Sequence, residues 1–514
     1  MPEPRVNAAT RAARWILLLL LAGLLIGRRD FAHLNLGDLW KILNLAPPTI
    51  LTYAFVTEST LLLLLPVALI RARELYDRAE GRTRFEKFLV AFGWSSIAAL
   101  GLIAWGALHA ALAKFNGGDN YLIVRQSALA LIYPSAFLYA FIFFGDSELN
   151  TRFAAFGAVS ASLFCALLDI FHLLDPKTTS LLPGTQGEWM PIYGQETLPI
   201  AILGLGFCVV ALRTWPLRAL ALAGVLLAGW RQSVRPTQSV VLIGMAFALA
   251  FLFAVGIATA FQKQFAALKR AALCIALFAI MAAGYRALKT FTAQPEQPGT
   301  ETASEIKAWN LEQYARLFEL FDSTQLPANP AERMIAKRPP YVPINDPEVA
   351  KLQAVFDATS VSVRNNIWRF LVWRRMANDW RNGHWLIGAG VGKPWFYRAL
   401  YQSGFHYGDD REGLDPHNSY LNTLYRYGLA GIALLALLIG ATLWRAGRAL
   451  ARNQGDIMLE VLLLYFGYTL LFAFFTVSLE GPAYSLPFWI TLGLIHARAS
   501  NLLTPAKESI ALHS

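Results

Sequence analysis

Charged residues are scarce in this 514-residue sequence: they make up 15% of the chain, against about 25% in typical soluble domains. Cysteine is rarer still. The three cysteines lie in apolar stretches, which argues against a disulfide framework or a thiolate metal cluster. Aromatic residues are plentiful, with 15 Trp, 18 Tyr and 33 Phe, and this excludes a disordered chain. With 56% hydrophobic residues and a mean hydropathy of +0.42, the sequence predicts a polytopic membrane protein.

Apolar runs long enough to cross a membrane, which takes about 20 residues, recur along the chain. We expect twelve helical spans, at about 12–27, 47–70, 88–113, 121–144, 154–174, 198–213, 217–230, 239–260, 271–288, 419–444, 457–479 and 482–497. The first resembles a secretory signal, but Gly27-Arg28-Arg29 is a poor cleavage site, so we expect it to stay uncleaved. The predicted fold class is therefore all-α, with about twelve transmembrane helices.

The distribution of lysine and arginine between the loops indicates the orientation of these spans. Loop 71–87 carries six basic residues, whereas loops 114–120 and 175–197 carry one lysine each. Basic loops face the cytoplasm, so both termini are predicted to be cytoplasmic. The chain then divides into spans one to nine (1–288), one large and mainly helical outside segment (289–418), and spans ten to twelve with a tail (419–514).

Some of the positive charge lies on the side where topology does not require it. The outside loop 230–238 contains Arg231 and Arg235 without an acidic neighbour. Snorkelling to the headgroups is one interpretation, and binding of an anionic lipid-linked ligand is the other. Between Arg364 and Arg398, seven basic residues accompany one acid, although a solvated surface normally mixes both signs. Arginine binds phosphate through a planar, bidentate fork.

The outside segment closes with two short motifs. His384 is followed by three alternating glycines, Gly388, Gly390 and Gly392, which allow close backbone approach. No strand precedes them, which argues against a dinucleotide site. His417 lies just before the tenth span, at the predicted membrane boundary. A structural role and a functional role are both open for this histidine.

These elements, in this order, resemble the O-antigen ligase and O-antigen polymerase family. Four pieces carry the resemblance: Arg369-Phe370-Leu371-Val372-Trp373, the turn from His384 to Gly392 with Trp385 where proline is usual, His417-Asn418-x-Tyr420-Leu421 followed by Gly428-x-x-Gly431, and the loop with Arg231 and Arg235. The match covers about 230–431. Arg426 stands where the family commonly has an acidic residue.

The resemblance implies a transferase at the periplasmic face of the bacterial inner membrane, among membrane lipids. It would move a glycan from undecaprenyl diphosphate to a hydroxyl on lipid A-core (a ligase) or on a second glycan (a polymerase). Neither a cofactor, a metal nor a nucleic acid is expected. Arg369 and Arg235, or Arg231, would bind the diphosphate, and His417 would lie beside the acceptor hydroxyl as a general base. Further substrate-binding residues would be Trp373, Arg364, Asn418 and His384.

Two other classes of protein remain open. A transporter or flippase would use intramembrane charges such as Glu58, Arg125, Asp169 and Glu460 to line a path, but the sequence has no internal half-repeat of the kind that many transporters contain. A structural assembly partner would leave the outside arginines without a role. The ligase-like transferase is therefore the leading prediction, and the polymerase is the alternative within the same class.

Overall fold

The computed structural model describes residues 8–33, 55–118, 120–145, 272, 369, 373–374, 376–378, 380–392, 417–452, 456–474, 479 and 482–503. Within these residues the regular structure is helical and contains no strand, which confirms the all-α class for this part of the chain. The predicted spans at 154–174, 198–213, 217–230, 239–260 and, apart from residue 272, 271–288 lie outside it. The count of twelve spans therefore stays a prediction.

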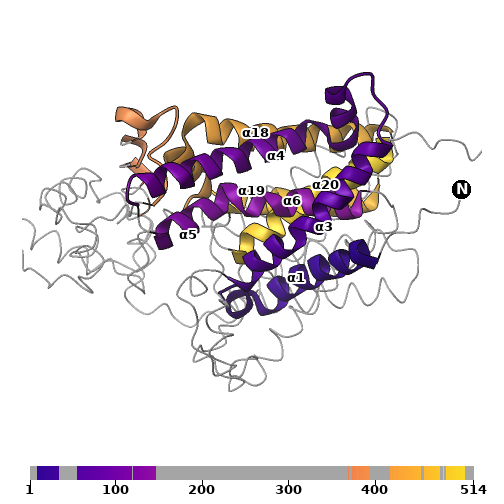
Figure 1. Ribbon diagram of the computed structural model, residues 1–514, viewed down its shortest axis with the longest axis horizontal. Helices are drawn as coiled ribbons and strands as arrows, with labels where there is room; N and C mark the ends of the chain where they lie inside the picture. The colour runs from indigo at the N-terminus through magenta and orange to yellow at the C-terminus, as the bar shows by residue number, and fades with distance from the viewer. Residues whose placement is uncertain are drawn as a thin grey trace, which may run out of the picture.

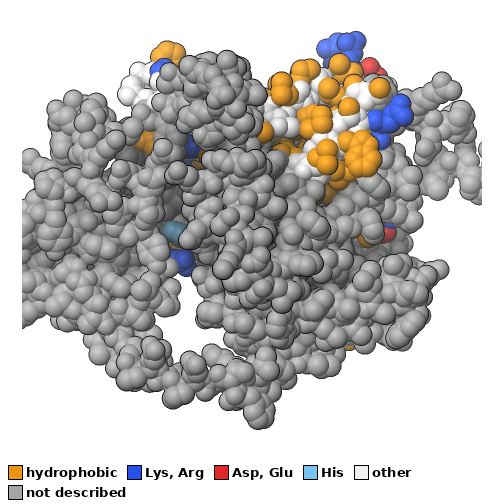
Figure 2. Space-filling view, turned by 90° about the horizontal axis from the view of Figure 1, so that it is seen from below, with side chains coloured by type: hydrophobic (Ala, Val, Ile, Leu, Met, Phe, Trp, Pro, Cys, Tyr) orange, Lys and Arg blue, Asp and Glu red, His pale blue; other side chains and the backbone are white. Residues whose placement is uncertain are grey.

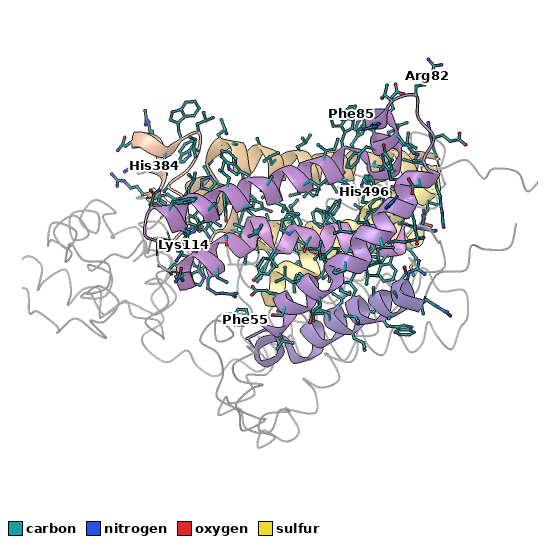
Figure 3. The ribbon with its side chains drawn as sticks, viewed as in Figure 1. Phe55, Arg82, Phe85, Lys114, His384 and His496 are labelled. Carbon is teal, nitrogen blue, oxygen red and sulfur yellow. The ribbon has the colours of Figure 1, made fainter. Side chains whose placement is uncertain are left out.

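The described helices form a bundle in which α4 and α18 pack along each other (Figure 1). The elements are α1 (Ala8–His33), α3 (Val56–Arg78), α4 (Arg84–Phe115), α5 (Asn120–Leu131), α6 (Tyr133–Phe144), a short π-helical turn η2 (Trp380–His384), α18 (Ser419–Arg452), α19 (Ile457–Phe472) and α20 (Pro482–Leu503). Arg82 and Phe85 lie at one end of the bundle, and His384 and Lys114 lie at the other (Figure 3). We call the latter the His384 end.

The centre of the bundle is the contact between α6 and α20. Ten of the 12 residues of α6 are buried, as expected for a helix that is apolar on all sides. Gly493 on α20 allows the two backbones to approach, because a Cβ atom there would lie 2.4 Å from the carbonyl oxygen of Phe137. Small residues permit such close helix packing in membrane proteins.

Three helical segments are long and apolar enough to cross a membrane: Arg84–Phe115, Leu122–Phe144 and Ser419–Arg452. They coincide with three of the predicted spans. At 1.5 Å per residue, the 34 residues of α18 extend about 50 Å, more than the roughly 30 Å of hydrocarbon. This helix therefore has room for a membrane-spanning part and for an end beyond the membrane.

The structure differs from the predicted spans in two details, an internal break and one boundary. The first concerns only the interior of span 121–144, whose ends agree with the potential span Leu122–Phe144: it contains two helices, which meet at Ile132 because Pro134 has no N–H to donate to the preceding turn. The span predicted at 47–70 continues as a helix to Arg78, so loop 71–87 is helical in its first half. The i,i+3 and i,i+4 ion pairs Arg71–Glu74 and Arg73–Asp77 accompany this extension and support an isolated helical turn.

Large apolar side chains are exposed on the outer faces of several helices. Leu63 on α3 is 78% exposed and Trp444 on α18 is 72% exposed. In the view from below, apolar side chains gather on one part of the described surface with basic side chains at its edge (Figure 2). Such surfaces are unfavourable in water and favourable against lipid tails, in agreement with a membrane environment.

A buried ion pair joins α3 to α5. Glu58 accepts hydrogen bonds from Arg125 and, at 2.8 Å, from the hydroxyl of Tyr133. Arg125 also lies over the ring of Phe55, 4.1 Å from its centroid. Two of the four charged side chains considered for a transport path are thus paired with each other, whereas Asp169 lies outside the described residues. Glu460 is buried near the start of α19.

We expect the Glu58→Ala substitution to destabilise the bundle strongly, because it leaves the Arg125 charge buried without its carboxylate. Breaking such a pair costs about 3–5 kcal/mol, whereas replacing both partners by apolar residues is often near neutral. The double variant Glu58→Met/Arg125→Met should therefore recover most of the loss in thermal unfolding in detergent. Asp77→Ala is the matched control, since its pair with Arg73 is exposed and worth about 0–1 kcal/mol. Equal losses in Glu58→Ala and Asp77→Ala would contradict this interpretation.

Candidate active site

The turn from His384 to Gly392 depends on its three glycines. Gly388, Gly390 and Gly392 all have positive φ, at 90°, 83° and 82°, in the region where a side chain is strained. Space is also short: a Cβ at Gly388 would lie 2.3 Å from the carbonyl oxygen of Arg426. Gly388 therefore serves close backbone approach to α18, as the sequence suggests, whereas a Cβ at Gly392 would lie 2.7 Å from the side chain of Ile123 on α5.

Helix α18 is broken where the turn meets it. Gly428 has φ 66° and ψ −168°, a conformation that interrupts the regular i to i−4 hydrogen bonds of a helix. The N–H groups of Leu429 and Ala430 would otherwise bind the carbonyls of Tyr425 and Arg426. Instead, Leu429 donates to the carbonyl of Trp385 at 2.9 Å, and Ala430 donates to that of Leu386 at 3.2 Å.

The two carbonyl groups released by this break are bound by the same turn. Ala389 donates its N–H to the carbonyl of Tyr425 at 2.7 Å, and Gly390 donates to that of Arg426 at 3.0 Å. Four backbone hydrogen bonds thus replace two helical ones and clamp the turn to α18. A Cβ at Gly428 would lie 2.2 Å from the carbonyl oxygen of Leu386, so glycine is required there as well.

Side chains from α4 and α5 hold the break in place. The indole of Trp105 donates to the carbonyl of Tyr427 at 3.0 Å, and the Tyr427 hydroxyl donates to the carbonyl of Gln126 at 2.7 Å. The side chain of Gln126 in turn accepts the N–H of Gly392 at 2.8 Å. The turn, the broken helix and two further helices therefore form one connected unit at the His384 end.

The start of α18 presents His417. This residue has φ 52° and is the one non-glycine residue with positive φ among the described residues. Asn418 follows as the N-cap of α18, because its side chain accepts the N–H of Leu421 at 2.9 Å. The hydroxyl of Tyr420 donates to the carbonyl of Leu470 at 2.6 Å and so ties this end to α19. Strained backbone of this kind is concentrated at functional sites.

Arg369 lies close enough to His417 for its charge to act on the imidazole. Burial of the ring and, as a smaller contribution, the positive charge of Arg369 lower the pKa of His417 from 6.5 to about 4. The imidazole is therefore neutral at physiological pH and can accept a proton. Two residues 48 positions apart in the sequence, each selected from a different motif, are thus brought together by the fold.

A second arginine, Arg426, lies within α18 and is 1% exposed. Its Nε donates to the side chain of Asn422 at 2.9 Å. The sequence marked Arg426 as a departure from the family pattern and assigned it no role. The sequence did contain a sign of its importance, because a cation occurs within a long apolar helix and buried arginines at membrane depth are generally functional or paired. No acidic residue occurs in 380–392 or 417–430, so these segments contribute only positive charge.

The other predicted site residues have different positions. Trp373 is helical and half-buried. His384 is exposed at the end of η2. Asn418 is buried and its side-chain oxygen caps α18, a structural role beside the predicted one. Arg231, Arg235 and Arg364 lie outside the described residues. Within the described part, no three His, Cys, Asp or Glu side chains are grouped as metal ligands.

Comparison with known proteins adds no assignment: the chain matches no protein-family model and no curated protein sequence.

We expect Gly428→Ala to loosen the turn, because alanine must adopt a left-handed conformation and place its Cβ against Leu386. The left-handed backbone alone costs about 1–2 kcal/mol. Gly440→Ala is the matched control in the same helix, with open space around the added Cβ, and should be neutral or stabilising by up to about 1 kcal/mol. Thermal unfolding in detergent measures the first effect, and faster tryptic cleavage after Arg381 reports release of the turn. Equal stability and cleavage in the two variants would show that the clamp is not needed.

Proposed function

We propose that this protein is a membrane-embedded transferase of lipid-linked glycans, of the O-antigen ligase type. The observation that carries the proposal is the proximity of Arg369 and His417 at one end of a bundle with three potential membrane-spanning helices. The cation is suited to a diphosphate and the neutral imidazole is suited to an acceptor hydroxyl. The motif resemblance, from Arg369 to Gly431, supports the same activity.

The reaction would be a single displacement at the anomeric carbon of the donor. The acceptor oxygen forms a new bond to this carbon while the bond to the diphosphate oxygen breaks, and the diphosphate leaves with the electron pair. Arg369 stabilises the negative charge that grows on the leaving group, which is most effective in a partly desolvated site. His417 accepts the proton of the acceptor hydroxyl. The configuration at the anomeric carbon is inverted, because one displacement occurs.

The low pKa of His417 matters for this role. In the absence of donor the imidazole is neutral but a weak base, since burial and the Arg369 charge oppose protonation. A diphosphate bound beside Arg369 brings negative charge, which favours the imidazolium. Binding of the donor would therefore raise the basicity of His417 at the moment when a proton must be accepted.

The location and the acceptor belong to the same proposal. The site would face the periplasm, with both termini in the cytoplasm of a bacterial cell, as the distribution of basic loops suggests. Lipid A-core is the acceptor for the ligase and a second glycan is the acceptor for the polymerase. Both use the same donor chemistry, so an assay that offers the two acceptors side by side distinguishes them.

Two substitutions test the catalytic roles. Arg369→Ala should lower the transfer rate from undecaprenyl-diphosphate glycan by about 10²–10³, by analogy with loss of one oxyanion donor. His417→Asn should lower it by about 10²–10⁴, the contribution of a general base. Asparagine is chosen because it tolerates positive φ, which preserves the backbone at the start of α18.

Arg374→Ala is the control for Arg369→Ala, because this arginine lies five residues further on and is exposed; its activity should equal that of the wild type. Near-wild-type transfer by both Arg369→Ala and His417→Asn would rule out this site. Strict dependence of the wild type on added Mg²⁺ would rule out arginine as the main stabiliser of the leaving group.

The pH dependence of the rate tests the basicity of His417. We expect kcat/KM, which reports the free enzyme, to lose activity only as the pH falls through about 4, where His417 is protonated. For kcat, which reports the donor complex, the acidic limb should lie at higher pH because the diphosphate stabilises the imidazolium. In Arg369→Gln the acidic limb of the remaining kcat/KM should shift to higher pH, because the positive charge that lowers the pKa of His417 is removed. The limb should stay below pH 6.5, because burial is the larger cause of the low pKa and is unchanged. A wild-type kcat/KM limb at the ordinary 6.5 would contradict the proposed environment.

A further inference from the structure

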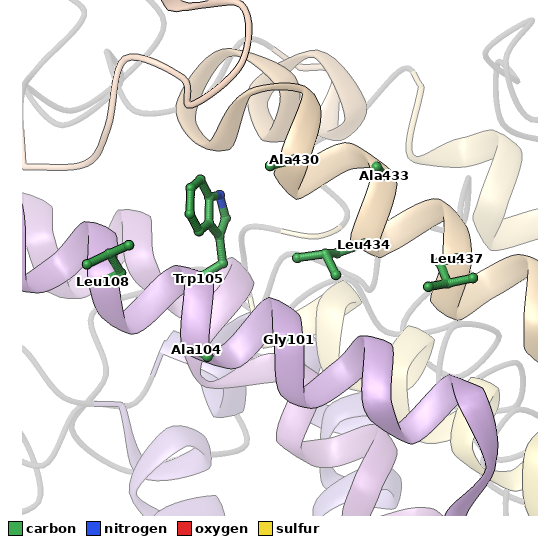
Figure 4. Close-up of a pocket in the computed structure, with 8 residues that line it drawn as sticks. All are labelled: Gly101, Ala104, Trp105, Leu108, Ala430, Ala433, Leu434 and Leu437. Atoms are coloured by element: carbon green, nitrogen blue, oxygen red, sulfur yellow. The ribbon is translucent and has the colours of Figure 1, made fainter. Parts of the chain in front are cut away.

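An apolar groove of about 570 Å³ lies between α4 and α18 (Figure 4). One wall includes Gly101, Ala104 and Trp105 of α4, and the other includes Ala430, Ala433 and Leu434 of α18. The groove exists because glycine and alanine face each other along both helices and leave the space that larger side chains would fill. Further along each wall, Leu108 and Leu437 are 46% and 49% exposed, so the groove opens onto the apolar surface of the bundle.

Both walls of the groove are joined to the unit formed by the clamped turn and the helix break. Ala430, which lines the groove, donates its N–H to the carbonyl of Leu386 in the clamped turn. Trp105, on the opposite wall, donates to the carbonyl of Tyr427 at the helix break. The ring of Trp105 packs edge-on against that of His109, with centroids 5.0 Å apart, which fixes its orientation. One wall of the groove is therefore hydrogen-bonded to the clamped turn, and the other wall is hydrogen-bonded to the helix break.

The chemistry of the two neighbouring regions is complementary to one kind of ligand. Residues 380–392 and 417–430, which include the clamped turn and the helix break, contain Arg381 and Arg426 and no acidic residue. In the groove itself, no lining residue is charged. A lipid whose diphosphate lies among the cations would extend its chain away from them along α4 and α18. From Ala430 to Leu437 this path covers about 10 Å of helix, and the small residues leave room for a chain with methyl branches.

We propose that this groove binds the isoprene units next to the diphosphate of the polyprenyl-linked donor. The inference rests on the proposed function, because the diphosphate supplies the reason for a polyprenyl chain rather than an ordinary acyl chain to occupy this position. By holding the first part of the chain, the groove fixes the depth of the diphosphate relative to Arg369 and His417. Selection of the donor then depends on its lipid as well as on its charge.

Photo-crosslinking tests the location directly. We would introduce benzoylphenylalanine at Ala433 in the full-length protein in nanodiscs and add undecaprenyl diphosphate, with Leu63 on α3 as a lipid-exposed control position. We expect about tenfold more adduct at 433 than at 63, which is a preference of about 1.4 kcal/mol. Unlabelled undecaprenyl diphosphate should compete and phosphatidylglycerol should not. Equal adducts at the two positions, or equal competition by the phospholipid, would show that bulk lipid fills the groove and would overturn the proposal.

Filling the groove tests its effect on the reaction. Ala433→Trp should raise KM for the undecaprenyl-linked donor about tenfold and change kcat by less than about twofold, because the reacting groups are untouched. Leu63→Trp should leave both constants unchanged, and thermal unfolding of each variant checks that it is folded. An unchanged KM in folded Ala433→Trp would overturn the groove. If the wild type transfers no glycan, the proposed function fails, whereas the crosslinking result still decides whether the groove holds a polyprenyl chain.

Discussion

The break in α18 at Gly428 is the constraint on which the candidate site depends. Inside a membrane, backbone N–H and C=O groups must be paired within the protein, since lipid offers them no partner. Irregular backbone in this helix is therefore tolerated only because the turn at 385–390 binds all four released groups. The interaction is reciprocal. The turn, with three left-handed glycines, has a defined conformation only while the broken helix supplies its partners.

The clamp between the turn and α18 determines the position of the charged residues on the first turns of α18. Four backbone bonds, supported by Trp105, Tyr427 and Gln126, attach the turn from His384 to Gly392, which belongs to the segment 289–418, to helices α4, α5 and α18. His417, with its low pKa, lies two residues before the start of α18, and the break at Gly428 lies about 16 Å further along the chain at the helical rise of about 1.5 Å per residue. Arg426 is buried between these two points. A turn held in this way has fixed backbone dipoles, so under the proposed function little rearrangement would be needed to bind an anion.

Much of the described architecture could be predicted from the sequence, and there are physical reasons why the rest could not. Apolar run length located three potential spans, but it could not show that Pro134 divides one of them or that α3 continues to Arg78 through a basic segment. The glycine pattern predicted close backbone approach at 388–392. It could not identify α18 as the partner, because the four bonds join residues about 40 positions apart and use backbone groups, which carry no sequence signal. The same holds for Glu58 and Arg125: both were recognised as unusual, and only their spatial arrangement shows that each neutralises the other.

The arginines at the His384 end differ in their surroundings from the basic residues of the predicted cytoplasmic loops. Arginine on a cytoplasmic loop orients a span and needs no partner beyond water and headgroups. Arg369 and Arg426 are different, because they occupy partly or fully buried positions where solvation is reduced and an anion is correspondingly more stabilising. α4 and α18, which the clamp connects, leave an uncharged groove between them. Under the proposed function, a cationic end and an apolar groove would suit a ligand that is itself divided into a charged head and a long tail. Both features depend on one helix that is interrupted at a single glycine.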